Sequence, residues 1–181
     1  MLETKNTVAT LYYDIDFETA REFCDWISEN KNATELVLFI DCVGGINSAA
    51  RKMVKAINNF EGIFTTINTG TCASAAVDIF LAGNRRFATP SVDFMIHKVV
   101  LIVPNNCIMT ISEMQGYLKK MIDETAQTFK YIERRCGLTC ETLLEKTADS
   151  VEWHFDEKTA LEYNIISDVI EEIMPTKRKK K

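Results

Sequence analysis

The 181-residue sequence lacks the signals of a membrane-spanning or secreted protein. It has no run of about 18 consecutive apolar residues, which a transmembrane helix needs, and it does not begin with a basic segment followed by an apolar one. We therefore expect a cytoplasmic protein that does not bind membranes. Histidine is also scarce: His97 and His154 are the two in the chain, so few side chains titrate near neutral pH.

The cysteines form no pattern typical of a metal site or a disulfide framework. One close pair occurs, four residues apart, and no histidine stands at zinc-finger spacing from it. We expect these thiols to be mostly small buried apolar groups in a reducing compartment, and we expect no metal or organic cofactor. The six are Cys24, Cys42, Cys72, Cys107, Cys136 and Cys140.

Basic residues are concentrated at one end of the chain. The net charge is −5, but the last five residues carry +5, which leaves 16 basic and 26 acidic side chains, or −10, on the rest. An acidic body argues against nucleic-acid binding. Length and composition predict one domain over residues 1–174, followed by a basic tail at 175–181. The tail is more typical of a solvated terminus than of a tether for an anionic partner.

Short apolar segments alternate with segments of helical periodicity along most of the chain. Uncharged strands alternating with helices predict an α/β fold with a largely parallel sheet that is covered on both faces. The expected strands are 8–12, 36–40, 63–68, 86–88, 94–96, 99–103 and 165–170. The expected helices are 17–30, 48–60, 75–82, 111–135, 138–146 and 156–163.

The helix expected at 111–135 is longer than a small α/β core covers. Its apolar residues recur at steps of three and four, from Ile111 through Leu118 to Ile132. We predict that it projects from the domain. The alternative is a helix packed along its whole length on its own core.

Ser74 stands where the apolar strand at 63–68 leads into the helix at 75–82, within Thr69-Gly70-Thr71-Cys72-Ala73-Ser74-Ala75-Ala76. Backbone N–H groups at a helix N-terminus have no intrahelical partner and can stabilise an anion formed during acyl transfer. A serine at this corner is therefore a candidate nucleophile. Small residues here also fit a simpler explanation, close packing of the helix on the sheet.

A serine nucleophile needs a base, and His97 ends another short apolar strand. Gly44-Gly45 follow the strand at 36–40. Because the carboxyl ends of parallel strands meet at one edge of a sheet, these three features are expected at the same edge. Each has a structural explanation of its own, such as a tight turn at the glycines. Together they are typical of a serine–histidine acyl-transfer site.

Several blocks resemble the proteolytic subunit of the Clp protease family, ClpP. Residues 70–75 (Gly-Thr-Cys-Ala-Ser-Ala) are similar to that family's Gly-x-Ala-Ala-Ser-Met, and residues 95–97 (Met-Ile-His) to the start of its Met-Ile-His-Gln. Residues 40–45 (Ile-Asp-Cys-Val-Gly-Gly) are similar to its Ile-Asn-Ser-Pro-Gly-Gly, and residues 160–167 to its Ala-x-Glu-Tyr-Gly-Leu-Ile-Asp. The resemblance covers about residues 8–170.

The resemblance implies a ClpP/crotonase-like spiral of ββα units with a protruding handle helix at about 99–135. It implies a serine endopeptidase that works through an acyl-enzyme, with Ser74 as nucleophile, His97 as base, and the N–H groups of Gly45 and Ala75 as oxyanion hole. Residues 99–103 would form an edge to which an extended peptide adds as a strand. The substrate would be a peptide or unfolded protein, and the assembly a homo-oligomeric ring. The family's segments that help dock an ATPase ring have no counterpart before Val8, so an ATPase partner stays open.

The family's third catalytic residue is an aspartate, and this chain departs from that pattern. Counting back from Glu162-Tyr163 without a gap places Glu152 there; Asp149 is the nearest alternative and Asp156 a weaker one. A surface carboxylate is the simpler explanation of Glu152. Val151 replaces the arginine that the family often uses in ring–ring contacts, so a double ring is not implied.

Two other functions stay open at this stage. The altered third acid favours a catalytically impaired ClpP-like scaffold or assembly protein. The fold and its paired N–H groups are also shared with crotonase-type acyl-CoA enzymes, which need neither Ser74 nor His97.

Overall fold

The computed structural model describes residues 1–101, 103, 106–148 and 152–171 as an α/β structure. Its strands are β1 (Leu2–Lys5), β2 (Val8–Ile15), β3 (Glu35–Gly45), β4 (Ile63–Ala73), β5 (Arg85–Ala88), β6 (Asp93–His97), β7 (Glu152–Phe155) and β8 (Asp168–Val169). Its helices are α1 (Phe17–Glu29), α2 (Asn47–Asn58), α3 (Ala75–Ala82), α4 (Ile111–Arg135), α5 (Cys140–Lys146) and α6 (Glu157–Glu162).

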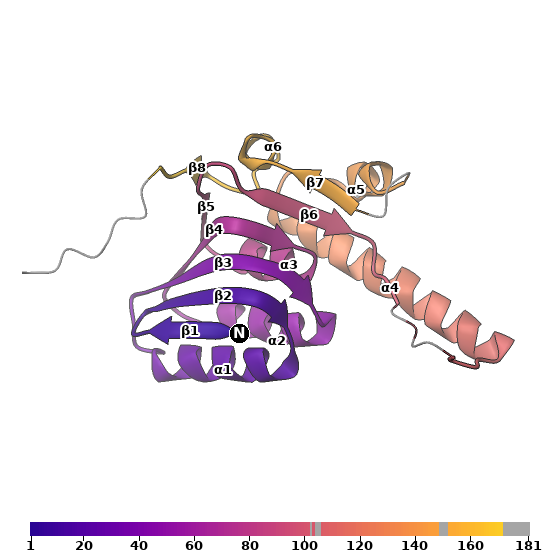
Figure 1. Cartoon of the computed structure of the whole chain (residues 1–181). Helices are drawn as coiled ribbons and strands as arrows, with labels where there is room; N and C mark the ends of the chain where they lie inside the picture. Colours follow the sequence, from indigo (N-terminus) through magenta and orange to yellow (C-terminus); the bar gives the residue numbers. More distant parts are fainter. Residues whose placement is uncertain (102, 104–105, 149–151, 172–181) are drawn as a thin grey trace, which may run out of the picture.

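The strands of the described chain form one sheet, in the order β1-β2-β3-β4-β5-β8, with β6 and β7 branching from β4. All pairs are parallel except β1–β2 and β6–β7. The branch arises because β4 changes partner along its length: residues 65–68 pair with β5, and residues 71–73 pair with β6. As a result, the carboxyl ends of β2, β3, β4 and β6 lie at the same edge (Figure 1).

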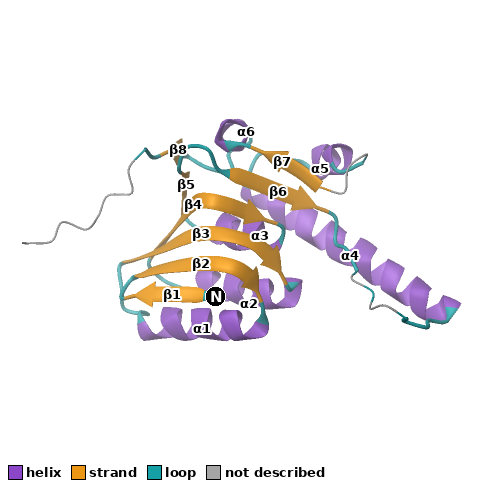
Figure 2. Ribbon diagram, viewed as in Figure 1, coloured by secondary structure: helices purple, strands orange, loops and turns teal. Residues whose placement is uncertain are grey.

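Helices α1, α2 and α3 pack against one face of the sheet (Figure 2). Asp16 caps α1 as its side chain accepts a hydrogen bond from the N–H of Thr19 at 2.7 Å. The core below contains Phe23, Trp26 and Phe64, whose ring centroids lie 5.6–6.1 Å apart. Helix α3 is apolar except for Asp78 and is buried along nearly its whole length, which fixes the corner that precedes it.

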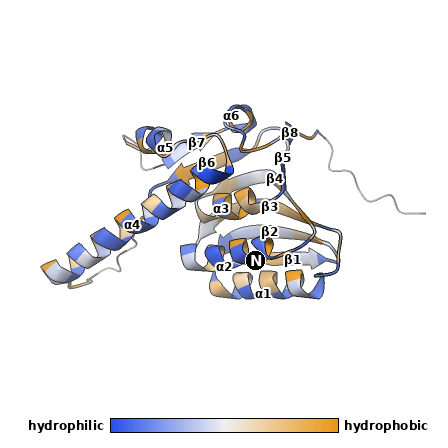
Figure 3. Cartoon of the chain, turned by 180° about the vertical axis from the view of Figure 1, so that it is seen from behind, coloured by the Kyte–Doolittle hydropathy of each residue, from blue (hydrophilic) through white to orange (hydrophobic). Residues whose placement is uncertain are grey.

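Helix α4 projects from the body, as predicted (Figure 1). Among its 25 residues only Phe129 and Ile132, near its C-terminal end, are buried. Its free end begins at a capping box between Thr110 and Glu113. Apolar side chains stay exposed along it, including Leu118 and Ile122, and Figure 3 shows apolar positions recurring along this helix. The alternative of packing along its whole length is wrong.

Four local features differ from expectation, and one of them is the strand expected at 165–170, of which only β8 (Asp168–Val169) is a strand. Strands β1 and β7 were not predicted, because each is short, mostly exposed and rich in polar residues. The strand expected at 99–103 is wrong for its described residues: the N–H of Val99 bonds to Thr125 Oγ1 at 3.0 Å, and the segment lies against α4 without pairing in the sheet. β-branched residues favour a strand only where a neighbouring strand supplies the hydrogen bonds.

The predicted tail at 175–181 lies outside the described residues. Within the part of the chain that the structure describes, no helix is both long enough and apolar enough to cross a membrane.

Candidate active site

Ser74 occupies a strained backbone position between β4 and α3. Its φ of 55° and ψ of −125° lie in a region that residues with a Cβ rarely adopt, at a cost on the order of 1–3 kcal/mol. Two backbone bonds hold it: its N–H donates to the Met95 carbonyl at 2.8 Å, and its own carbonyl accepts from the N–H of Val77 at 3.0 Å. Strain of this kind gathers at functional sites, and here it turns the Ser74 side chain toward β6.

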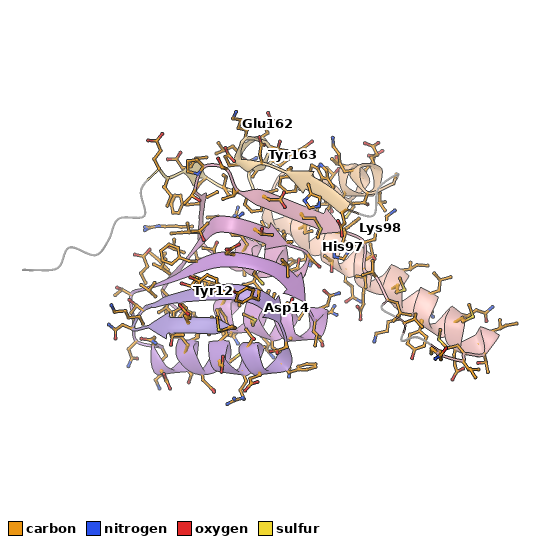
Figure 4. The ribbon with its side chains drawn as sticks, in the orientation of Figure 1. Tyr12, Asp14, His97, Lys98, Glu162 and Tyr163 are labelled. Atoms are coloured by element: carbon orange, nitrogen blue, oxygen red, sulfur yellow. The ribbon has the colours of Figure 1, made fainter. Side chains whose placement is uncertain are left out.

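His97, the last residue of β6, meets that side chain. Its Nε2 lies 2.6 Å from the Oγ of Ser74, and its Nδ1 lies 2.5 Å from the carbonyl oxygen of Lys98. A carbonyl oxygen accepts only, so Nδ1 carries the proton of the neutral ring. Nε2 is therefore the acceptor of the Ser74 hydroxyl proton, as a general base requires. Figure 4 labels His97 and Lys98 side by side at the end of β6.

Gly44 and Gly45 close the opposite side of the site, and both need to be glycine. Gly44 has a φ of 102°, and a Cβ there would lie 2.7 Å from the Cβ of Ser74 and 3.1 Å from the N of Ala75. Gly45 has a φ of 144°, and a Cβ there would collide with the backbone of Ile15. The missing side chains let this turn approach Ser74 and the first residue of α3.

The predicted third acid, Glu152, lies directly opposite His97 in the antiparallel β6–β7 register. Opposite residues point to the same face, with Cβ atoms about 4.5–5.5 Å apart, so the Glu152 carboxylate is close enough to reach the His97 imidazole. In the structure one of its oxygens lies 3.4 Å from Nε2 of His154, whose Nδ1 lies 2.9 Å from Asp93. The hydrogen bond that the structure gives His97 Nδ1 goes to Lys98.

Of the two alternative candidates for the third catalytic acid, Asp149 and Asp156, the structure describes only the second. Asp149 lies outside the described residues. Asp156 caps α6, and hydrogen bonds from the backbone and side chain of Thr159 lower its pKa below the ordinary value. Its carboxylate therefore has a structural use at the helix end.

A pocket of about 540 Å³ opens beside Ser74. Apolar side chains from several elements line it, together with three acidic residues. Asp14 lies near the end of β2, Asp16 follows that strand, and Asp78 comes from the first turn of α3. Its lining is Asp14, Ile15, Asp16, Gly45, Ile46, Asn47, Ser74, Ala75, Asp78, Ile96, His97, Val99, Val100, Thr128 and Ile132.

The thiols nearest Ser74 do not compete with its hydroxyl. Burial raises the pKa of Cys42 to about 11 and that of Cys72 well above the ordinary value. Both are therefore neutral near pH 7, and a neutral thiol is a poor nucleophile. Within the described ranges, no cluster of three or more histidine, cysteine, aspartate or glutamate side chains has the geometry to hold a metal ion.

Comparison with known proteins places the chain in a family. The model of the Clp protease family matches residues 4–173. The chain belongs to the Clp protease family. Its fold is similar to that of a mutant of ClpP1 from Listeria monocytogenes, with a TM-score of 0.81 and 21% identity over 93% of each chain. A search of curated proteins gave no match.

The family match and the structural likeness confirm the predicted ClpP-like fold, and the Clp protease family is a family of peptidases. Two features of the site were not predicted from the sequence. The Lys98 carbonyl is a backbone group, so its role cannot be predicted from a pattern of side chains. Asp78 was recognisable as the one charged residue in an apolar helix, at i+4 from Ser74, but its burial depends on α4.

The ionisation of Asp78 gives a testable pH dependence. Burial raises the pKa of Asp78 from 3.8 to about 7, although the neighbouring Arg51 lowers it. The unfolded chain loses this proton from about pH 4 upward, while the folded chain keeps it until about pH 7. The carboxyl group therefore costs more stability as the pH rises through that window, on the order of 4 kcal/mol above pH 8.

We expect Asp78→Asn to be more stable than wild type at pH 8 and close to it at pH 4, measured by urea unfolding across this range. Asp25→Asn, on the exposed surface of α1, controls for the loss of a carboxylate. A stability difference that does not change with pH would contradict a raised pKa of Asp78 in the folded protein.

Proposed function

We propose that the chain is a serine endopeptidase that hydrolyses peptide bonds through an acyl-enzyme. The observation that carries the proposal is the 2.6 Å contact between Ser74 Oγ and His97 Nε2, at a pocket in a member of the Clp protease family. The tautomer set by Lys98 supports it, because it leaves Nε2 free of a proton and facing the hydroxyl.

In the first step, Ser74 Oγ attacks the carbonyl carbon of the scissile bond while its proton passes to His97 Nε2. A C–O bond forms and the carbonyl oxygen becomes an oxyanion. The N–H groups of Gly45 and Ala75 stabilise that charge; the close approach of the glycine turn to Ser74 and Ala75 supports this assignment. The C–N bond then breaks, and His97 gives its proton to the leaving amine.

In the second step, water attacks the ester. His97 takes a proton from the water, a second oxyanion forms at the same position, and the proton returns to Ser74 Oγ as the acid product leaves. The charged imidazole needs support at Nδ1 in both steps. We propose Glu152 for that role, on the strength of its position opposite His97, with the Lys98 carbonyl holding the ring beforehand.

The substrate is a peptide or unfolded protein chain, and the working form is a homo-oligomeric ring. Exposed apolar side chains on α4 support assembly, because a stable monomer rarely leaves such a row uncovered. The six cysteines are all unpaired, which supports a reducing compartment such as the cytoplasm. An ATPase partner would supply unfolded substrate, as implied by the family.

The remaining alternatives have less support. A crotonase-type acyl-CoA enzyme has no use for a serine and histidine in hydrogen-bond contact. A scaffold without activity has no use for a strained φ of 55° at Ser74, which costs stability and turns the hydroxyl to the imidazole.

A fluorophosphonate probe tests the nucleophile. We expect one adduct, on Ser74, located by mass spectrometry of the assembled protein. Ser74→Ala should abolish the adduct and lower kcat for peptide hydrolysis by about 10⁴-fold or more, and His97→Ala should abolish most of both. Ser28→Ala, on the exposed end of α1, should label like wild type. An unlabelled wild type, under conditions that label a control peptidase, would overturn the proposal.

The role of Glu152 has its own test. We expect Glu152→Gln to lower kcat by about 10²-fold or more with KM little changed, since a neutral amide cannot stabilise the imidazolium. Glu162→Gln, a surface carboxylate on α6, should leave kcat unchanged. A loss below about tenfold for Glu152→Gln would assign the orientation of His97 to the Lys98 carbonyl alone.

Native mass spectrometry tests the ring. We expect a closed multiple of the 20.6 kDa chain, and we expect the double variant Leu118→Glu and Ile122→Glu to lower the assembly state, because both side chains are about 60% exposed on one face of α4. Lys119→Glu is the control, because it changes the charge at a neighbouring position of α4 without removing an apolar side chain. A wild type of 20.6 kDa at all concentrations would exclude a ring.

A further inference from the structure

Asp78 is a partly buried acid in the pocket that the proposed mechanism does not use. It stands four residues after Ser74, on the same face of α3 and one helical turn, or about 6 Å, further along the axis. Its Oδ1 is shielded from solvent and has no hydrogen-bond partner among the described residues. A buried polar atom without a partner is costly, so it indicates that something outside the chain completes the site.

Apolar side chains line much of the pocket that holds Ser74 and Asp78. Ile96 from β6, Val99 from the segment after it and Ile132 from α4 are among them, and Thr128 of α4 adds a hydroxyl. An aliphatic stem packs well against such walls, and a positive head group at its end would meet the carboxylate. Lysine and arginine side chains have this form.

The charges around Asp78 favour an external cation. Asp14 and Asp16 line the same pocket, and Figure 4 shows Asp14 near the end of β2, on the sheet edge where His97 also lies. Arg51 from α2 faces Asp78 from a neighbouring cavity, but its guanidinium lies 3.5 Å from both Glu124 and Gln127. Lys130, Tyr131 and Arg134 of α4 line that second cavity as well.

We propose that Asp78 makes this pocket select peptides with lysine or arginine on the acyl side of the scissile bond. The inference rests on the proposed function and adds a substrate class to it. A carboxylate in a specificity pocket selects basic side chains, because a bound cation supplies the hydrogen-bond donors and the opposite charge that the carboxylate lacks. An apolar side chain would fill the same space and leave the carboxyl buried and unpaired.

Matched fluorogenic peptides test this inference. Substrates ending in Ala-Ala-Arg, Ala-Ala-Lys and Ala-Ala-Leu before the fluorophore differ only in the side chain that enters the pocket. We expect wild type to cleave the two basic peptides with a kcat/KM at least tenfold above that of the leucine peptide. Asp78→Asn should reduce this ratio at least tenfold, through a loss of kcat/KM for the two basic peptides.

The pH profile supplies a second readout. Because the pKa of Asp78 is raised to about 7 by burial, the ratio of arginine to leucine cleavage should increase as the pH rises from 6 to 8.5. Taking the ratio cancels any effect of pH on the acyl-transfer steps that the two substrates share. The ratio for Asp78→Asn should stay flat over the same range, while Asp25→Asn should follow wild type.

The outcomes separate this inference from the function on which it rests. Cleavage of the leucine peptide without preference for the basic ones, or an unchanged ratio in Asp78→Asn, would overturn the specificity and leave the peptidase standing. If Arg51→Gln prefers the basic peptides and wild type does not, then Arg51 neutralises Asp78 in wild type. That result also overturns the proposed specificity. Absence of both cleavage and a fluorophosphonate adduct on Ser74 would overturn both proposals. A melting curve for Asp78→Asn establishes that the variant is folded.

Discussion

The candidate site depends on one backbone hydrogen bond, from the N–H of Ser74 to the carbonyl of Met95. It continues the short β4–β6 ladder to the end of β4, after that strand has already left β5. The bond holds the strained corner of Ser74 against the strand that ends in His97. A serine and a histidine 23 residues apart therefore meet at 2.6 Å without a long loop between them. The burial of α3 supplies the rigidity, since a helix packed on nearly every face has little freedom to relax the corner.

The orientation of the imidazole shows how backbone and side-chain groups share a task. The Lys98 carbonyl selects the tautomer, and any hydrogen-bond acceptor at Nδ1 would do the same. Stabilising the positive imidazolium is different, because a neutral carbonyl offers a dipole where a carboxylate offers a full charge. Glu152 is placed to supply that charge across the β6–β7 ladder, and His154 and Asp93 hold it in a small network on the same face. The hydrogen bond that the His154 imidazole donates to the Asp93 carboxylate raises the pKa of His154, with a smaller contribution from Glu152.

The pocket combines a family architecture with charges of its own. A likeness at 21% identity carries the path of the chain, whereas the lining of the pocket belongs to this sequence. Asp78 takes its character from three elements: α3 bears it, α4 covers it, and the Tyr131 hydroxyl of α4 bonds to the Asp78 carbonyl at 3.1 Å. Burial by those neighbours raises its pKa, which makes an otherwise ordinary carboxyl group sensitive to whatever enters the pocket.

Local pattern was enough to determine much of this protein. The bounds of α3 and α4, the cap at Asp16, the strand-to-helix corner at Ser74 and the strand end at His97 all follow from periodicity and capping residues, which act over a few positions. Which segments pair or pack with one another did not follow from the local pattern. The strand β7 exists because β6 pairs with it, and residues 99–101 are not a strand because no strand of the described chain pairs with them. Asp78 acquires its surroundings from α4, whose Tyr131 bonds to it from 53 positions further along the chain. Register and burial are set by contacts between distant segments, and those contacts were decided only when the chain had folded.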